Sequence, residues 1–302
     1  MKKKIKHRIE YILFLGFGFI VRLLPVSALH HAAALLVDIL YPLLKKRRNV
    51  AMQNLFNAYP EKSRKELEKI ARGSFKSVAT ALLELLWVPR FTVETLKRFI
   101  VIENPDFLLN TVASGKGCVL ISAHFGNWEL NALVTKSHLA VPCIAVEKVQ
   151  SNPLIHKCIH EYRKKFGAIV LPMELSIREI LKTLQAGGAV AMAVDQAAAK
   201  ESVGAEFFGR VVPTFQGPAV FSLRTGAPIL IGLAVRQADG TYRVMFHKVP
   251  SDDLDGASEK NIVELTQRHI KLTEQLIREH PEQWMWMHRR WKHVPDRVHI
   301  SL

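Results

Sequence analysis

The strongest constraint on this chain is an apolar run that stops at a histidine. Residues 118–123 have the composition of a buried β-strand, and His124 follows them directly. Gly126 and Asn127 then favour a turn or a helix cap, and residues 128–134 fit the helix that follows. Ligands of open α/β sheets gather beyond the carboxyl ends of the strands, so His124 is a candidate functional residue.

Glu129 lies five residues after His124. In one continuous helix this spacing would turn the two side chains about 140° apart. If His124 precedes the helix and Glu129 sits in its first turn, the carboxylate can fold back onto the imidazole, fix its tautomer and raise its basicity. Alternatively, His124 is a hydrogen-bonded loop residue and Glu129 is a charge favoured by the helix dipole. The spacing by itself leaves both interpretations open.

The first 48 residues combine apolar segments with basic clusters. Lysines and one arginine crowd residues 1–8, apolar runs cover 9–24 and 26–44, and a second basic cluster occupies 45–48. Neither run is a clean span of the roughly 20 apolar residues that cross a bilayer. Positive charge on both flanks favours helices that lie in one leaflet with both ends cytoplasmic. We predict membrane-associated helices over 1–48, with a buried helical hairpin or a single span as alternatives.

From residue 99 onward, strand and helix patterns alternate. This alternation predicts an α/β fold with a mixed, largely parallel central sheet flanked by helices, and we expect residues 49–302 to form one domain. The last two strands, joined through residues 238–240, are expected to form an antiparallel hairpin. The expected strands are 118–123, 142–147, 168–171, 189–194, 228–235 and 242–247; the helices between and after them are 105–113, 128–135, 152–166, 176–185, 217–225 and 259–280.

Charge and composition narrow the partners. Lys and Arg exceed Asp and Glu by 15 in a chain of 302 residues, which favours an acidic partner: nucleic acid, anionic lipid or an acidic protein. No nucleic-acid-binding motif accompanies the charge, so we expect no nucleic acid. The sequence holds no His-Glu-x-x-His or Cys/His ligand spacing and no glycine-rich phosphate loop, so no metal or other cofactor is expected.

Further candidate contacts lie at strand and helix ends. Asp195 and Gln196 follow the apolar segment 189–194, where they could orient a polar head group or a water molecule, or simply form a turn. Arg163 closes a predicted helix. Its planar fork could hold a phosphate, or its charge could only complement the helix dipole.

The C-terminal tail, residues 281–292, is rich in aromatic and basic side chains. It carries three tryptophans together with Arg289 and Arg290. This composition suits an interface between acyl chains and anionic head groups.

Two of these stretches resemble a known family. Residues 124–129, His-Phe-Gly-Asn-Trp-Glu, and the tail 281–292 are similar to signatures of the lipid A biosynthesis acyltransferases, the lauroyl- and myristoyl-type branch of the glycerolipid acyltransferase superfamily. Arg163 with Gly167 and the Asp195-Gln196 pair are similar to weaker motifs of that group. The chain departs from the pattern at residues 197–199, which are alanines where many members carry polar residues.

The resemblance implies a membrane-associated acyltransferase. His124, held by Glu129, would take the proton from an acceptor hydroxyl, which would then attack an acyl-carrier-protein thioester. The acceptor implied is a phosphorylated lipid A precursor, and the location is the inner membrane with the catalytic domain facing the cytoplasm. We also expect a monomer. The expected substrate contacts are Arg163, Asp195, Gln196, Asn127, Arg289 and Arg290.

Other functions remain open at this point. The changed residues after Gln196 leave another glycolipid acceptor, such as a phosphatidylinositol mannoside, as an alternative. A lipid or thioester hydrolase could use the same histidine and carboxylate to activate water. A non-catalytic membrane-binding protein would have His124 and Glu129 in structural roles.

Overall fold

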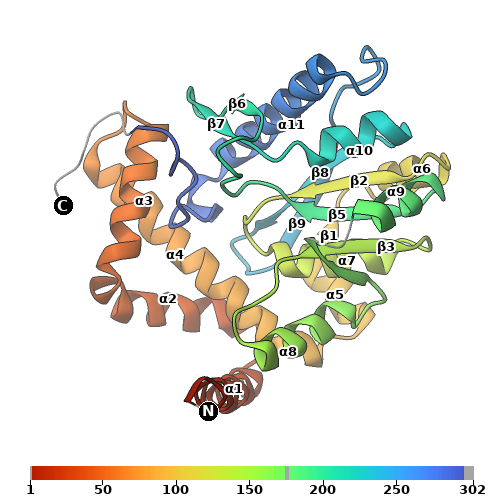
Figure 1. Cartoon of the computed structure of the whole chain (residues 1–302). Coiled ribbons are helices and arrows are strands. Elements are labelled where there is room, and N and C mark those ends of the chain that lie inside the picture. Colours follow the sequence, from red (N-terminus) through yellow and green to blue (C-terminus); the bar gives the residue numbers. More distant parts are fainter. Residues whose placement is uncertain (1, 174–176, 296–302) are drawn as a thin grey trace.

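A computed structural model describes residues 2–173 and 177–295 and places a group of N-terminal helices beside an α/β part (Figure 1). The helical group comprises α1 (Lys2–Leu23), α2 (Leu29–Leu40), α3 (Lys45–Ala58) and α4 (Arg64–Trp87). The short helical turns η1 (Val26–Ala28) and η2 (Tyr41–Leu43) join the first three, and η3 (Val88–Arg90) follows α4. The expected boundary after residue 48 falls inside α3, and the division into 1–48 and 49–302 stays a prediction.

The central sheet has seven strands in the order β1-β9-β8-β2-β5-β3-β4. Among these pairs only β8 and β9 run antiparallel, so the predicted mixed, largely parallel sheet and its terminal hairpin are confirmed. A separate two-stranded ribbon pairs β6 (Gly204–Glu206) with β7 (Val211–Pro213). The sheet strands are β1 (Ile100–Ile102), β2 (Cys118–Ser122), β3 (Cys143–Glu147), β4 (Ile169–Pro172), β5 (Ala189–Ala193), β8 (Ile229–Arg236) and β9 (Tyr242–Lys248).

All six expected strands are present within about a residue or two of their predicted ends. Strand β1 and the ribbon were missed, because a three-residue strand is too short to show a period of two. The expected helix 176–185 appears as α9 (Ile177–Gln185), and Ser176 lies outside the described residues.

Helices cover both faces of the sheet. One core packs α5 (Val93–Phe99), α6 (Pro105–Ala113) and α7 (Trp128–His138) against Leu120, and the other packs α9, α10 (Gly217–Thr225) and α11 (Glu259–Glu279) against Val119 and Ile121. Helix α8 (Pro153–Lys164) connects β3 to β4. Because neighbouring residues of β2 point into different cores, the strand is apolar on both faces, and this explains its uninterrupted apolar run.

Helix α1 turns an apolar surface to solvent. Only its inner side packs on the protein, through Val21 against α4, and Asn152 at the start of α8 donates hydrogen bonds to the His7 carbonyl (2.9 Å) and to Glu10 (2.8 Å). The segment Val26–Leu43 is long and apolar enough to cross a membrane. The large side chains left exposed on α1 are Ile5, Ile9, Ile12, Leu13, Leu15, Phe17, Phe19, Ile20 and Leu23. Patches of this kind mark interaction surfaces, and the basic N-terminus favours a lipid one.

We expect the double variant Ile12→Ser, Leu13→Ser to bind anionic vesicles more weakly. Both side chains are about two-thirds exposed, at 67% and 66%. Removing each from the lipid should weaken binding about tenfold or more, given about 1.5–3 kcal/mol for burying such a side chain. The measurement is vesicle co-sedimentation. The matched control is Val211→Ser, Met245→Ser, which alters exposed apolar side chains on the α/β part and should change nothing. Equal loss in both variants would contradict docking through α1.

Candidate active site

His124 lies just beyond β2, beside the end of β5. The two strands are parallel neighbours, with Ser122 aligned to Ala193, so their following residues meet at the same edge of the sheet. Asp195 lies two residues after β5 and binds His124 twice. Its Oδ1 is 2.8 Å from His124 Nδ1, and its Oδ2 accepts a hydrogen bond from the His124 backbone N–H at 2.9 Å.

The carboxylate behind the imidazole is therefore Asp195, and the predicted contact between His124 and Glu129 is wrong. Glu129 forms a two-point ion pair with Arg163, at 2.6 Å from Nη2 and 2.9 Å from Nε. A guanidinium offers a charged, planar pair of donors that a neutral imidazole cannot match. Glu129 acts on His124 only at longer range, as one of the charges that raise its pKa.

His124 and Asp195 shift each other's pKa values. Burial alone would raise the pKa of Asp195, but His124 and the hydrogen bonds it receives lower that pKa, so the group is an anion. Burial alone would lower the pKa of His124, but Asp195 raises it above its ordinary value. An ionised carboxylate only accepts hydrogen bonds, so Nδ1 carries the proton and Nε2 keeps its lone pair.

The Nε2 atom of His124 faces Gln196. The Gln196 side-chain nitrogen lies 3.1 Å from it, so the amide of Gln196 faces the free lone pair of the imidazole. The His124 side chain is 21% exposed, so it can be reached from outside. The rings of His124 and Trp128 lie 5.2 Å apart. Asp195 and Gln196 thus do meet His124, in agreement with their placement at a strand end.

The C-terminal tail hydrogen-bonds to both His124 and Asp195. After η5 (Pro281–Gln283), Trp284 Nε1 donates to Asp195 Oδ2 at 2.7 Å, and the Met285 N–H donates to the His124 carbonyl at 3.0 Å. Ser74 of α4 in turn donates its hydroxyl to the Trp284 carbonyl. The tail and α4 therefore hold the carboxylate that orients the histidine, which sequence reasoning did not anticipate.

The tryptophans of the tail do not form a lipid interface. Trp284, Trp286 and Trp291 are 1%, 0% and 3% exposed and pack with Phe207 and Phe208. The predicted interfacial role was wrong because each ring has an apolar partner inside the protein. A tryptophan with its N–H satisfied, as in Trp284, is a good core residue.

Arg290 and Arg289, neighbours in the tail, differ in environment. Arg290 is 1% exposed and donates to the Pro213 carbonyl at 2.6 Å and to Thr214 at 2.8 Å; these are structural contacts, and its role as a substrate contact stays a prediction. Burial lowers its pKa to about 10. Arg289 is exposed, and its role as a substrate contact stays a prediction.

Asn127 is also structural. Its side chain is fully buried, its Oδ1 caps α7 by accepting from the Leu130 N–H at 2.9 Å, and its Nδ2 donates to Glu84 at 2.6 Å. Glu84 is buried as well and is held by Arg236 (2.9 Å) and Tyr242 (2.6 Å). Both amide atoms therefore bond within the protein, and the role of Asn127 as a substrate contact stays a prediction.

Arg163 joins two carboxylates. Besides Glu129 it binds Glu147 Oε2 through Nη1 at 2.6 Å, and Glu147 also accepts from His160 at 2.8 Å. The guanidinium of Arg163, which was expected to hold a phosphate, is thus engaged in internal ion pairs. Its contact with both carboxylates ties α8 to α7 beside the histidine.

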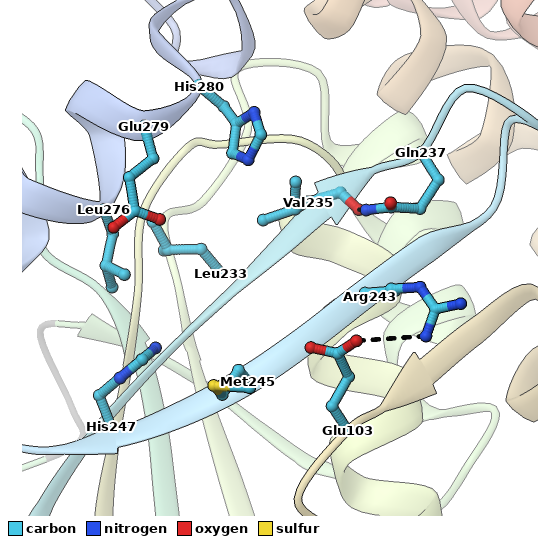
Figure 2. A pocket seen from close by; sticks show the side chains of 10 residues that line it. All are labelled: Glu103, Leu233, Val235, Gln237, Arg243, Met245, His247, Leu276, Glu279 and His280. Carbon is cyan, nitrogen blue, oxygen red and sulfur yellow. Dashed lines mark hydrogen bonds and ion pairs between the residues drawn. The ribbon is translucent and has the colours of Figure 1, made fainter.

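One hollow of the described structure lies away from this site. It measures about 350 Å³ and lies against β8 and β9, beneath the end of α11 (Figure 2). Leu233, Val235 and Met245 form an apolar floor, and Arg243 pairs with Glu103 at its edge (Figure 2). Neither His124 nor Asp195 lines this pocket. The candidate active site therefore rests on the geometry of its side chains and not on the pocket.

Comparison with known proteins identifies the chain. The sequence profile of the family described as "Bacterial lipid A biosynthesis acyltransferase" matches residues 1–293. The chain belongs to this family. The resemblance of residues 124–129 and 281–292 to lipid A biosynthesis acyltransferases is confirmed, and the chain is an acyltransferase.

Relatives of this family member act on two kinds of glycolipid. The lipid A biosynthesis palmitoleoyltransferase of Escherichia coli (strain K12) is 29% identical over 261 residues, covering 84% of this chain and 81% of the relative. The lauroyltransferase of the same strain is 26% identical over 299 residues, covering 97% and 95%. The phosphatidylinositol mannoside acyltransferase of Mycolicibacterium smegmatis (strain ATCC 700084 / mc(2)155) is 22% identical over 251 residues, covering 78% and 80%.

Proposed function

We propose that this family member moves a fatty acyl group from an acyl-carrier-protein thioester to a hydroxyl of a lipid A precursor, with His124 as general base. The observation that carries the proposal is the bond between His124 Nδ1 and Asp195. It fixes the tautomer, stabilises the imidazolium that forms and leaves Nε2 to accept a proton. The roles of Asp195 and His124 match those of the acid and the base in hydrolase triads.

The steps follow from this geometry. The acceptor hydroxyl displaces the Gln196 amide from Nε2 and gives its proton to that nitrogen as its oxygen forms a bond to the thioester carbonyl carbon. The tetrahedral intermediate then collapses, the C–S bond breaks, and the imidazolium returns the proton to the departing sulfur. No covalent acyl-enzyme is needed, since proton removal activates the acceptor directly.

The negative oxygen of that intermediate needs hydrogen-bond donors. The N–H groups of Phe125 and Gly126 are already donated to Ala123 and Gln283, and that of Leu130 to Asn127. Trp128 and Glu129 lie in the first turn of α7, where backbone N–H groups lack intrahelical acceptors. We assign the oxyanion to these two amides, at the positive end of the helix dipole.

The net charge of the chain and its exposed surface support the proposed substrates and location. A net charge of +15 suits an acidic carrier protein and a phosphorylated acceptor, and exposed Arg289 lies in the same tail as Trp284, which bonds to Asp195. The apolar surface of α1 and the basic residues at the starts of α1 and α3 suit attachment to the cytoplasmic side of the inner membrane. We propose this location, with residues 49–302 facing the cytoplasm and the chain acting as a monomer.

Leaving out the acceptor tests transfer against hydrolysis. We expect purified protein in lipid vesicles to release fatty acid from radiolabelled acyl-carrier protein roughly 100-fold or more slowly than it acylates a lipid A precursor, because no bound hydroxyl is positioned against the thioester. Full-rate release without acceptor would support a hydrolase instead. Neither transfer nor release would favour a non-catalytic membrane-binding protein.

The same assay decides between acceptors. Phosphatidylinositol mannoside offered in place of the lipid A precursor should be a poor acceptor. The family profile and the lipid A relatives favour the precursor, while the mannoside relative and the alanines at 197–199 favour the alternative. Faster acylation of the mannoside would replace the proposed acceptor but leave the roles of His124 and Asp195 unchanged.

A further inference from the structure

A second group of polar side chains surrounds Glu147, the carboxylate that Arg163 binds besides Glu129. Glu147 ends β3, and His156 and His160 stand four residues apart on one face of α8. Glu147 Oε1 is 2.8 Å from His160 Nδ1 and 3.5 Å from His156 Nε2, and one ligand atom from each of the three residues lies within 4.8 Å of the others. None of the proposed catalytic steps uses this group.

We propose that Glu147, His156 and His160 form a binding site for one divalent transition-metal ion of the zinc type. Around a tetrahedral ion with bonds of about 2.0–2.1 Å, neighbouring ligand atoms lie about 3.3 Å apart. The two observed separations from Glu147 Oε1 bracket that value. Two imidazoles with one carboxylate favour zinc, cobalt or nickel over magnesium or calcium, which prefer oxygen ligands.

The carboxylate is divided between two partners. Its Oε1 faces both histidines, and its Oε2 accepts from Arg163 at 2.6 Å. A metal ion bound to Oε1 would leave the hydrogen bond between Oε2 and Arg163 intact. Carboxylates that bind metals are commonly hydrogen-bonded to a second group in this way. The Arg163 cation is offset by Glu129 and Glu147 together, so the group carries one net negative charge when the imidazoles are neutral. That charge favours a cation.

The histidines are accessible and incompletely bonded. Their side chains are 21% and 27% exposed, which leaves room for entry and for a water molecule as a further ligand. Within the described part of the chain, His156 Nδ1 is buried without a hydrogen-bond partner, and the ring faces Glu147 through its other nitrogen, Nε2. The four-residue spacing of the two histidines is visible in the sequence, but Glu147, the third residue of the group, comes from strand β3.

Cobalt titration of the full-length, tag-free protein in detergent tests the site. After chelator treatment, we expect one equivalent of Co²⁺ to bind with the visible absorption of a site of low coordination number, and Zn²⁺ to displace it. His156→Ala and His160→Ala should each weaken binding by on the order of 100-fold or more, since even outer partners of a metal contribute 10–100-fold. His160→Gln keeps a donor for Glu147 and should lose the metal without loss of fold, as checked by circular dichroism.

The matched control removes another pair of neighbouring histidines in the described part of the chain. His30 and His31 are adjacent in α2, with ring centroids 3.8 Å apart, and they offer a cation an alternative site. His30→Ala, His31→Ala should keep the full equivalent of Co²⁺. Failure of the unsubstituted protein to bind Co²⁺, or loss of binding only in this control, would overturn the proposal. None of these readouts depends on acyl transfer, so they stand apart from the proposed function.

Discussion

Replacing His124 by alanine should lower acyl transfer by about 10²- to 10⁴-fold, the usual contribution of a positioned general base. Without the imidazole, no group at the end of β2 accepts the acceptor proton, while the donor and acceptor can still bind. The loss should therefore fall on kcat and not on KM. The measurement is steady-state transfer from radiolabelled acyl-carrier protein to the acceptor lipid in vesicles.

Two further variants keep this result interpretable. His124→Asn retains a donor for Asp195 and so protects the fold, but it cannot take up a proton, and it should be as inactive as the alanine variant. His138→Ala removes a side chain at the far end of α7 that bonds to Val134 and Ser137 of the same helix, and this variant should retain activity. Undiminished transfer by His124→Asn would remove the histidine from the mechanism.

Asp195→Asn should also lower activity, by up to about 10⁴-fold, the loss seen when the acid behind a catalytic histidine is made neutral. An asparagine can accept through one atom and donate through the other, so it no longer forces the proton onto Nδ1. The stabilisation of the imidazolium is lost at the same time. Glu129→Gln should have a smaller effect, because Glu129 contacts Arg163 and not the imidazole.

The pH dependence separates the two carboxylates more sharply. In the unsubstituted protein Asp195 holds the pKa of His124 above its ordinary value of 6.5, and the base must be neutral to act, so kcat/KM should rise with pH to a midpoint above 6.5. In Asp195→Asn the effect of burial remains without the carboxylate, so the midpoint should move to lower pH. The measurement is a profile of kcat/KM against pH.

The same profile provides the control. Asp239→Asn removes an exposed carboxylate from the turn between β8 and β9 and should leave the midpoint unchanged. A midpoint that moves most in Glu129→Gln and stays fixed in Asp195→Asn would restore Glu129 as the partner of His124 and refute the geometry described here.

Much of the site could be read from short stretches of the chain. The apolar run before His124, the strand before Asp195 and the helix cap at Asn127 are local patterns, and the structure contains all three. The signatures at 124–129 and 281–292 led to the family. Local patterns work here because strand burial and helix capping depend on residues within a few positions of each other.

The residue that pairs with His124 could not be predicted in the same way. Asp195 is 71 residues from His124, and the two meet only because β5 pairs beside β2 in a parallel register. Periodicity predicts that a strand exists but not which strand lies next to it. A general rule did contain the signal, since both residues follow strands whose carboxyl ends share an edge of the sheet.

The sequence by itself determined the α/β class, the six longer strands and the position of His124 at a strand end. Only the tertiary structure decided that Asp195 orients the imidazole, that Arg163 takes Glu129, that the tryptophans of the tail are buried and that Glu147 joins two histidines. The physical reason is that hydrogen bonds and ion pairs are chosen by competition among all groups within about 3 Å, and folding brings most competitors from distant parts of the chain.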